Sequence, residues 1–264
     1  MFIFFKIKYI FYSNSNYSIL KNYKNNLIMK IFYEKNASKF NLKKLIEKEK
    51  VIIIKNFFRK EKILSNLQKF KKKIKKMKLL KVSGPNYYLK KNYNRLDIGD
   101  YSQVNARFSR MIALFEWNKY EAFEDELKKL VNFRDKVLGL SKEKFIYKYN
   151  KKKLYNLQKV LHYPSGGGFM NKHTDGYNNE GFPNFLICVT KKGKNYFDGG
   201  AYYEISKKEI DVEEILNPGD IYFHSTNTLH GVKSIDNKKK LDIENLNKGR
   251  WAINLSLEEI KDEK

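Results

Sequence analysis

Helical periodicity dominates the N-terminal half of the chain. Between residues 60 and 78, apolar side chains recur at the three- and four-residue spacing of an amphipathic helix. The same spacing predicts a second long helix over residues 118–138 and a short one over residues 40–48. Residues 82–100 are rich in Asn, Gly and Tyr and show little periodicity, so we expect a loop there.

Alternating apolar and polar positions predict strands from about Leu154 onward. Residues 250–257 alternate cleanly, so that four residues share one inward face: Arg250, Ala252, Asn254 and Ser256. Further strands are expected at residues 51–54, 221–223 and 230–235. The pattern therefore predicts a mainly β fold with flanking α-helices.

A pair of potential metal ligands lies in the segment His173-Thr174-Asp175. Residues two apart in a strand point to the same face, so His173 and Asp175 can bind one metal ion without distortion of the backbone. The third ligand must come from another strand, and both His224 and His230 lie at predicted strand ends. Two imidazoles and one carboxylate form the facial triad that holds non-heme Fe(II) and leaves one side of the ion open.

Arg250 stands at the head of the inward face of the last predicted strand. A cation on a buried face is costly unless it binds an anion. The position of Arg250 therefore predicts that it binds an anion.

The order of these motifs resembles the HxD…H…R signature of the Fe(II)/2-oxoglutarate-dependent dioxygenases. Three further segments are similar to the prolyl-hydroxylase-like and phytanoyl-type branches: Tyr163-Pro164-Ser165-Gly166-Gly167-Gly168, Phe197-Asp198-Gly199-Gly200 and Pro218-Gly219-Asp220. The resemblance covers about residues 158–258. It implies a double-stranded β-helix, the jelly roll of cupin-like proteins, with the N-terminal helices packed on the sheet.

The sequence is expected to divide into three parts. Residues 1–28 are expected to form an N-terminal extension or poorly ordered tail, and Met29 is a candidate for the true start. Residues 29–153 form a helical and loop support region of the same domain, and residues 154–264 form the catalytic core.

The resemblance also implies roles for individual residues. The ligands of Fe(II) are His173, Asp175 and His230, and Arg250 pairs with the distal carboxylate of 2-oxoglutarate. His230 is favoured over His224 because it precedes Gly-Val at a strand start, as the distal ligand does in that family.

Two features depart from the family pattern. Many members carry a hydroxyl residue two positions after the arginine, where this chain has Ala252, so Tyr163 and Ser256 become the candidates for that contact. The gap between His230 and the arginine is also longer than expected and holds the polar segment 236–248, which we expect to be a surface loop.

The implied reaction is hydroxylation of a small-molecule or amino-acid-type substrate, in which 2-oxoglutarate and O2 become succinate and CO2. Ascorbate is a candidate reductant. The carboxylate of Asp175 favours hydroxylation, because a halogenating relative would need a small residue at that position. Two alternatives stay open: a non-catalytic metal- or ligand-binding jelly-roll module, and a nucleic-acid-modifying oxygenase.

The net charge of +25 would ordinarily suggest nucleic acid as a partner. AT-rich codons would produce the same excess of Lys together with abundant Asn, Ile, Phe and Tyr, so charge alone does not assign that partner. Residues 69–81, which place many Lys on one predicted helix, are the segment where an anionic surface would bind.

The single cysteine, Cys188, lies in an apolar run and is expected to be a buried structural residue. With no internal disulfide, a reducing setting such as the cytoplasm is favoured. Residues 1–12 are apolar but fall far short of the ~20 residues that span a bilayer, so no transmembrane segment is expected.

Several other side chains carry expectations of their own. His162, on an apolar strand, and Asp198, in a turn, are expected to be structural. Four residues of the 82–100 segment are candidates for contact with the substrate: Tyr87, Tyr88, Tyr93 and Arg95.

Overall fold

The structure is a computed structural model, and it describes these residues: 17–21, 27–37, 41–48, 51–82, 93–101, 104–115, 122–140, 154–175 and 182–259. Its helices are α1 (Glu34–Ala37), α2 (Leu42–Lys48), α3 (Lys60–Ile74) and α4 (Glu124–Leu138). The strands in the first half are β1 (Tyr17–Lys21), β2 (Leu27–Tyr33), β3 (Val51–Lys55), β4 (Leu79–Val82), β5 (Tyr93–Tyr101) and β6 (Val104–Phe115). Those in the second half are β7 (Leu154–Tyr163), β8 (Phe169–His173), β9 (Phe185–Cys188), β10 (Gly200–Ile205), β11 (Lys208–Asp211), β12 (Ile221–His224), β13 (Leu229–Lys233) and β14 (Arg250–Glu259).

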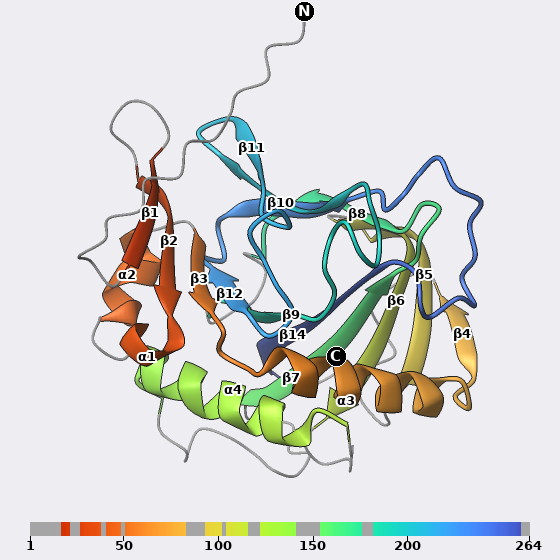
Figure 1. Cartoon of the computed structure of the whole chain (residues 1–264), viewed down its shortest axis with the longest axis horizontal. Helices are drawn as coiled ribbons and strands as arrows, with labels where there is room; N and C mark the ends of the chain where they lie inside the picture. The colour runs from red at the N-terminus through yellow and green to blue at the C-terminus, as the bar shows by residue number, and fades with distance from the viewer. Residues whose placement is uncertain are drawn as a thin grey trace, which may run out of the picture.

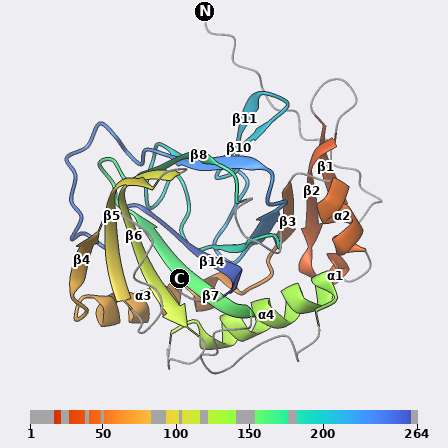
Figure 2. The ribbon, with the colours of Figure 1, turned by 180° about the vertical axis from the view of Figure 1, so that it is seen from behind.

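The strands fold over into two facing layers (Figure 1). The larger layer, which we call the major sheet, has the order β3-β12-β9-β14-β7-β6 and continues through β5 to β4. The smaller layer, the minor sheet, has the order β8-β13-β10-β11. Figure 2 shows β5, β6, β7 and β14 side by side in the major sheet. This is the jelly-roll architecture that the family resemblance implied.

One bent strand, β6, belongs to both sheets. Its second half pairs with β7 in the major sheet, from Arg110 opposite His162 onward. Its first half pairs with β8 in the minor sheet, through Ala106 and Arg107. Between the two halves, Phe108 has a φ of 53°, in the left-handed region that a bulky residue rarely adopts. The bend therefore joins the two layers at one edge.

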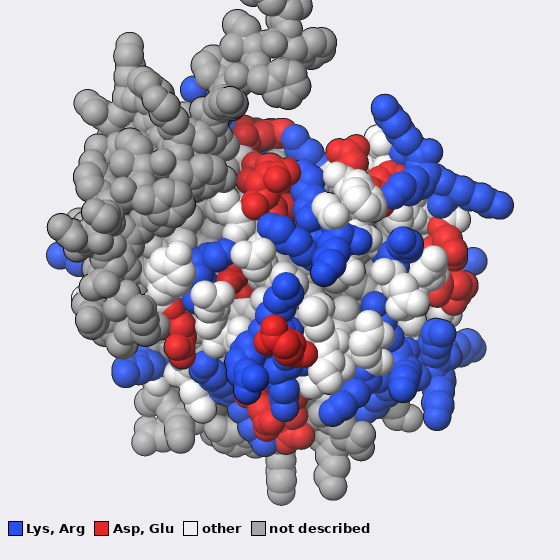
Figure 3. Space-filling model, in the orientation of Figure 1, with Lys and Arg blue, Asp and Glu red and all other residues white. Residues whose placement is uncertain are grey.

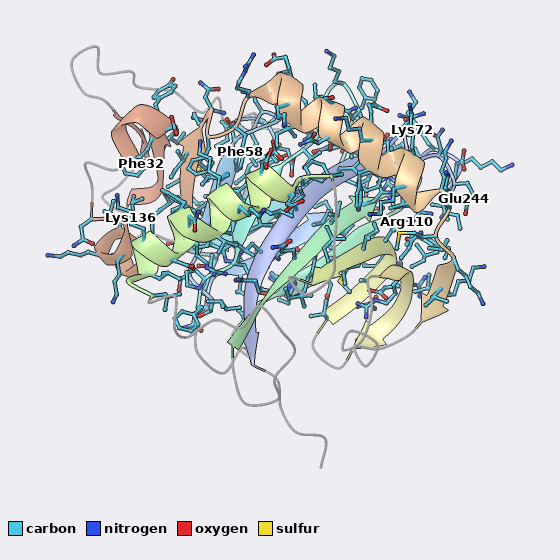
Figure 4. The ribbon with its side chains drawn as sticks, turned by 90° about the horizontal axis from the view of Figure 1, so that it is seen from below. Phe32, Phe58, Lys72, Arg110, Lys136 and Glu244 are labelled. Atoms are coloured by element: carbon cyan, nitrogen blue, oxygen red, sulfur yellow. The ribbon has the colours of Figure 1, made fainter. Side chains whose placement is uncertain are left out.

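Helices α3 and α4 cover the outer face of the major sheet (Figure 4). Their apolar stripes pack against residues of β6, β7 and β14 that point outward, including Ile112, Val160 and Ile253. Full burial of a Leu or Ile side chain contributes about 1.5–3 kcal/mol, so this layer supplies much of the stability. Residues one position along the same strands, such as Met111 and Leu161, point inward to a separate core between the sheets.

The strands predicted from alternation are confirmed. The apolar run at residues 51–54 forms β3, whose four apolar residues are buried between β2 and β12. In β14, Arg250 and Ala252 face inward while Trp251 and Ile253 face the helices. Helix α3 begins where the periodicity placed it and ends four residues earlier, at Ile74. Helix α4 begins at Glu124, and residues 118–121 of the predicted helix lie outside the described part.

The predicted loop at residues 82–100 is wrong in part. Residues 93–101 form β5, which pairs with β6 along its whole length, and Leu79–Val82 forms β4. Periodicity does not reveal this strand because residues 94–97 are all buried and only Leu96 is apolar; the others, Asn94, Arg95 and Asp97, are polar. Residues 83–92, with Tyr87 and Tyr88, lie outside the described part.

The structure also bears on the N-terminal division of the chain. Strand β1 lies within the stretch expected to be an extension, and it pairs with β2, which adds both strands to the edge of the major sheet beside β3. The region expected to be helices and loops contributes β2 to β6 as well. Within the described residues, no helix is both long and apolar enough to cross a bilayer.

Candidate metal centre

His173 and His230 lie opposite each other on neighbouring strands of the minor sheet. His173 is the last residue of β8, and His230 is its register partner on β13. Directly opposed side chains in an antiparallel pair have Cβ atoms about 5 Å apart, and here the ring centroids lie 4.3 Å apart. Gly231 permits the close approach of β13 to β8, because a Cβ at that position would lie 3.0 Å from the carbonyl oxygen of Asn171 on β8.

Asp175 completes the group two residues beyond His173. One carboxylate oxygen, Oδ1, lies 3.7 Å from Nε2 of His173, and Oδ2 lies 3.6 Å from Nε2 of His230. The amide of Asn184 donates to Oδ2 at 2.8 Å, and the backbone N–H of Asp175 donates to the carbonyl of Thr226 at 2.9 Å. These two bonds fix the carboxylate between the imidazoles.

His224 brings a third imidazole to the same carboxylate. It ends β12 in the major sheet, is buried, and places Nε2 3.8 Å from Oδ2 of Asp175. Its ring centroid lies 4.3 Å from that of His230. His224 and His230 are thus neighbours in space, although sequence reasoning treats them as alternatives.

All three imidazoles present the same nitrogen to the carboxylate. In each ring, Nδ1 lies within hydrogen-bond distance of a backbone carbonyl: that of Asn171 for His173, Ser225 for His224 and Thr228 for His230. A ring that donates from Nδ1 carries its lone pair on Nε2 when it is neutral. The backbone therefore selects the tautomer that a metal ligand needs.

Burial and mutual proximity tune the ionisation of this group. Burial lowers the pKa of His230 to about 4, and the charge of His224 acts in the same direction. Burial likewise lowers the pKa of His173 and of His224. Burial opposes ionisation of Asp175, but the three imidazoles outweigh it and lower the pKa of its carboxyl group. Near neutral pH the group thus offers neutral imidazoles and an ionised carboxylate.

These donors fit a single metal ion. The candidate ligand atoms of His173, Asp175 and His230 all lie within 4.8 Å of one another. Ligand atoms ~2.0–2.2 Å from one ion are separated by at most ~4.4 Å, so a shift of a few tenths of an ångström closes the group around an ion. Two imidazoles and a carboxylate suit Fe(II), with the remaining positions open to other ligands.

Arg250 is buried, and it has a partner that the sequence did not reveal. Its Nε donates to Oε1 of Glu213 at 2.6 Å, and its Nη2 donates to the hydroxyl of Tyr222 at 2.8 Å. Glu213 in turn accepts from the backbone of Ala201 and from the hydroxyl of Tyr196. Burial alone would lower the pKa of Arg250, but the charge of Glu213 raises it well above its ordinary value.

The expectation that Arg250 must meet an external anion therefore needs correction. Glu213, only 2% exposed, already compensates the buried guanidinium. Among the described residues, the hydrogen bonds of Arg250 are made by Nε and Nη2, and none is made by Nη1. The backbone before Arg250 is equally constrained: Gly249 has a φ of 103°, and a Cβ there would lie 2.3 Å from the carbonyl oxygen of Tyr163.

The two hydroxyl candidates for cosubstrate contact lie in different places. Tyr163 packs beside Arg250, with the guanidinium carbon 5.7 Å from its ring centroid, and its hydroxyl points toward the sulfur of Met170. Ser256 lies six residues further along β14, roughly 20 Å at the rise of a strand, and its hydroxyl donates to the carbonyl of Leu157. The structure thus brings Tyr163 to the arginine but not Ser256.

Other residues singled out by sequence have structural surroundings. Cys188 is buried and donates to the carbonyl of Thr190, and burial raises the pKa of its thiol. Asp198 accepts from the next backbone N–H in a turn. Arg95, a candidate for substrate contact, is buried and pairs with Asp97 at 2.7 Å. For Tyr93, only the backbone is described, within β5.

Sequence reasoning missed four residues of the site: Asn184, Tyr203, Glu213 and Tyr222. Tyr203 is the register partner of His230 on β10, and its ring also contacts His224. Tyr222 carried a usable signal, because it lies two residues before His224 in a predicted strand and so shares its face. Glu213 carried none, since it stands in an acidic run that is typical of a solvated turn.

Comparisons with known proteins identify the fold. Neither a family model nor a curated protein sequence matches the chain. Among solved structures, a Pseudomonas putida prolyl-4-hydroxylase matches with a TM-score of 0.51 at 10% identity, covering 83% of this chain and 98% of that one. A prolyl hydroxylase from Trichoplax adhaerens, in complex with a hypoxia inducible factor peptide, matches with a TM-score of 0.50 at 14% identity, covering 84% and 88%.

A third structure adds a ligand to the comparison. A full-length protein of Neurospora crassa, in complex with α-ketoglutarate, matches with a TM-score of 0.51 at 12% identity, covering 91% of this chain and 87% of that one. At such low identity these likenesses show a shared fold.

Proposed function

We propose that this protein is an Fe(II)/2-oxoglutarate-dependent dioxygenase that hydroxylates a small-molecule or amino-acid-type substrate. The observation that carries the proposal is the convergence of His173, Asp175 and His230 from separate segments of a jelly roll. The fold shared with two prolyl hydroxylases and with a protein that holds α-ketoglutarate supports it. A reducing, cytoplasmic setting is part of the proposal, in keeping with the single buried Cys188.

Each residue of the site has a role in this proposal. His173, Asp175 and His230 would hold the iron, and Asn184 would keep the carboxylate aimed at it. The iron would supply the activation of dioxygen that oxidises 2-oxoglutarate to succinate and CO2 and hydroxylates the substrate. The protein positions these groups and excludes water from them.

Arg250 would hold the distal carboxylate of 2-oxoglutarate through Nη1, the nitrogen that Glu213 and Tyr222 do not use. Glu213 and Tyr222 fix the direction of the guanidinium, so that little side-chain entropy is lost when the ligand binds. The ring of Tyr163 covers one side of the same group. Tyr163 and Arg250 are therefore the cosubstrate residues that we retain, and Ser256 is not.

One observation favours the alternative of a non-catalytic ligand-binding jelly roll. The ion pair between Arg250 and Glu213 compensates the buried charge of Arg250 within the fold, so no cosubstrate is needed to explain that residue. The third proposal, a nucleic-acid-modifying oxygenase, gains no such support. The exposed Lys of α3 lie on the outer face of the major sheet, and Figure 3 shows Lys and Arg interspersed with Asp and Glu.

The test is formation of succinate from 2-oxoglutarate in the presence of Fe(II), O2 and ascorbate. We expect slow turnover without substrate, faster turnover with the right member of a substrate panel, and none in His173→Ala. Lys172→Ala is the matched control, because Lys172 neighbours His173 but points to solvent and pairs with Glu204. Metal binding without any turnover of 2-oxoglutarate would establish the binding module instead.

A further inference from the structure

A second buried arginine lies on the opposite face of the major sheet from the metal centre. Arg110 is on β6, where Met111 and Ala113 point inward and Ile112 and Leu114 point toward the helices. By strand alternation Arg110 shares the helix-facing side, and it is only 2% exposed. It belongs to neither the metal group nor the Arg250 pair.

The only hydrogen-bonding partner of Arg110 among the described residues is neutral. Its Nη1 lies 3.4 Å from Nδ1 of His162, and Nε2 of His162 lies 2.8 Å from the carbonyl of Lys248. That carbonyl requires a donor, so Nδ1 is the lone-pair nitrogen that accepts from Arg110. Burial lowers the pKa of His162 to about 3, which keeps this ring uncharged.

The positive charge of Arg110 therefore has no directly bonded counter-ion within the described part of the chain. Its Nε forms no hydrogen bond there, and burial lowers its pKa although the charge of Glu244 acts in the other direction. Lys71, a second buried cation beside His162, is held by the amide oxygen of Asn247 rather than by an acid. Buried cations are normally paired with an anion, because removing a charge from water without a counter-ion is costly.

A cavity adjoins this unpaired guanidinium. It has a volume of about 350 Å³ and lies between the end of α3, strands β4 to β6 and the 236–248 segment. Its walls are apolar on several sides, through Ile74, Met77, Leu79 and Leu246. Asn94 also lines it and has a buried amide oxygen without a hydrogen bond. Figure 4 shows Arg110 beneath the end of α3, with Glu244 beside it.

The 236–248 segment, expected to be a polar surface loop, forms one wall of this cavity through Glu244 and Leu246. Leu246 is buried, and its carbonyl accepts from the indole of Trp251. At its other end Asp236 accepts from the hydroxyl of Ser165 and from two backbone N–H groups. The segment that departs most from the family pattern thus forms one wall of the cavity.

We propose that this cavity binds a small organic acid, with its carboxylate on Arg110 and its apolar body against the hydrocarbon walls. A guanidinium fork at the base suits a carboxylate, and the Asn94 amide can turn to offer its N–H groups to the same ligand. Glu244 and Lys75 both line the cavity and their opposite charges offset, so the apolar walls decide which class of anion fits. A monocarboxylate therefore fits better than a phosphate.

The test is calorimetric titration of the full-length protein with octanoate. Inorganic phosphate and chloride are titrated at matched ionic strength. We expect octanoate to bind at one site, and Arg110→Gln to weaken binding by about tenfold or more. Glu244→Gln, an exposed change that spares the fold, should tighten binding by about two- to fivefold, because it removes a repelling charge.

Two controls isolate the site. Glu61→Gln alters a carboxylate in the first turn of α3, at the end away from the cavity, and should not change the affinity for octanoate. His173→Ala should leave octanoate binding intact while it abolishes turnover, so failure of this inference and failure of the proposed function are distinguishable. Equal binding to wild type, Arg110→Gln and Glu244→Gln would overturn the inference, and so would binding of phosphate in place of octanoate.

Discussion

Two buried arginines, Arg250 and Arg110, show two ways in which this fold handles an interior cation. They lie on β14 and β6, on either side of β7, and they point to opposite faces of the major sheet. Arg250 is 3% exposed and has a carboxylate and a phenol as partners. Arg110 is as deeply buried but has only a neutral imidazole as its hydrogen-bonding partner among the described residues.

The difference in partners distinguishes an arginine that stabilises the fold from one that is suited to bind a ligand. An arginine that is fully compensated by its own protein stabilises the structure without a ligand, and any ligand it binds uses only its remaining donors. An arginine without a bonded counter-ion costs stability until an anion arrives. The same residue type thus carries a stronger indication of a ligand at Arg110 than at Arg250, contrary to what the family resemblance suggests.

The largest effect is expected from breaking the compensated pair. Glu213→Gln leaves Arg250 as an uncompensated buried charge and should lower the free energy of unfolding by about 3–5 kcal/mol. Arg110→Gln removes a charge that had no bonded counter-ion, so stability should stay within about 1 kcal/mol of wild type or rise. Urea unfolding followed by tryptophan fluorescence measures both. Similar losses of unfolding free energy in the two variants would show that Arg110, like Arg250, has a counter-ion in the folded protein.

The next effect concerns 2-oxoglutarate. If Arg250 holds the distal carboxylate, Arg250→Gln should raise the KM for 2-oxoglutarate by about ten- to a hundredfold, the value of a charge-assisted hydrogen bond. Arg110→Gln should leave this KM unchanged, because it lies on the other face of the sheet. A direct titration with Mn(II) in place of iron separates binding from turnover. An unaltered affinity in Arg250→Gln would remove that residue from the cosubstrate site.

A smaller effect is expected in the pH dependence of stability, through His162, the neutral partner of Arg110. Burial lowers the pKa of His162 to about 3, from an ordinary value of about 6.5 in the unfolded chain, so the unfolded state binds the proton first. The stability that the neutral ring contributes is complete above pH 6.5 and is lost as the pH falls toward 3. Between pH 6.5 and 5 we expect a loss of about 1.5 kcal/mol. Unfolding measured across this range should show a shallower decline in His162→Gln.

The smallest effect is expected at Lys71. Burial lowers its pKa to about 8, so holding its charge inside the protein is unfavourable. Lys71→Met keeps the hydrocarbon packing and loses the bond to Asn247, and the two changes should offset to within about 1 kcal/mol. The exposed neighbour Lys72→Met is the matched control. A loss of several kcal/mol in Lys71→Met alone would mean that the buried cation has a counter-ion after all.

Periodicity predicted those parts of the fold where burial separates apolar from polar residues. Strand β14 alternates because one face meets helices and the other meets the interior, and α3 has an apolar stripe for the same reason. Periodicity did not predict strand β5. Arg95 and Asp97 are buried there as an ion pair, but in the sequence they look like solvent-exposed residues. Ion pairs between buried residues do not produce a hydrophobic periodicity in the sequence.

The candidate site shows the same limit. The two-residue spacing of His173 and Asp175 and the inward position of Arg250 are local features, and sequence reasoning finds them. Glu213 acts on Arg250 across a distance that only the folded sheet closes. The neutral partner of Arg110 and the cavity beside it are likewise products of packing, so no pattern in the sequence predicts them.

The register of β8 against β13 has a consequence for how the protein is made. His173 meets His230 only after strands that are distant along the chain have paired. In small metal-dependent domains the ion gathers its ligands from one short segment and organises the chain around itself. Here residues 173 and 230 must both have left the ribosome, and β8 and β13 must have paired, before the candidate ligands meet. Under the proposed function, iron would therefore bind after the protein has folded, and its binding would not be a step in folding.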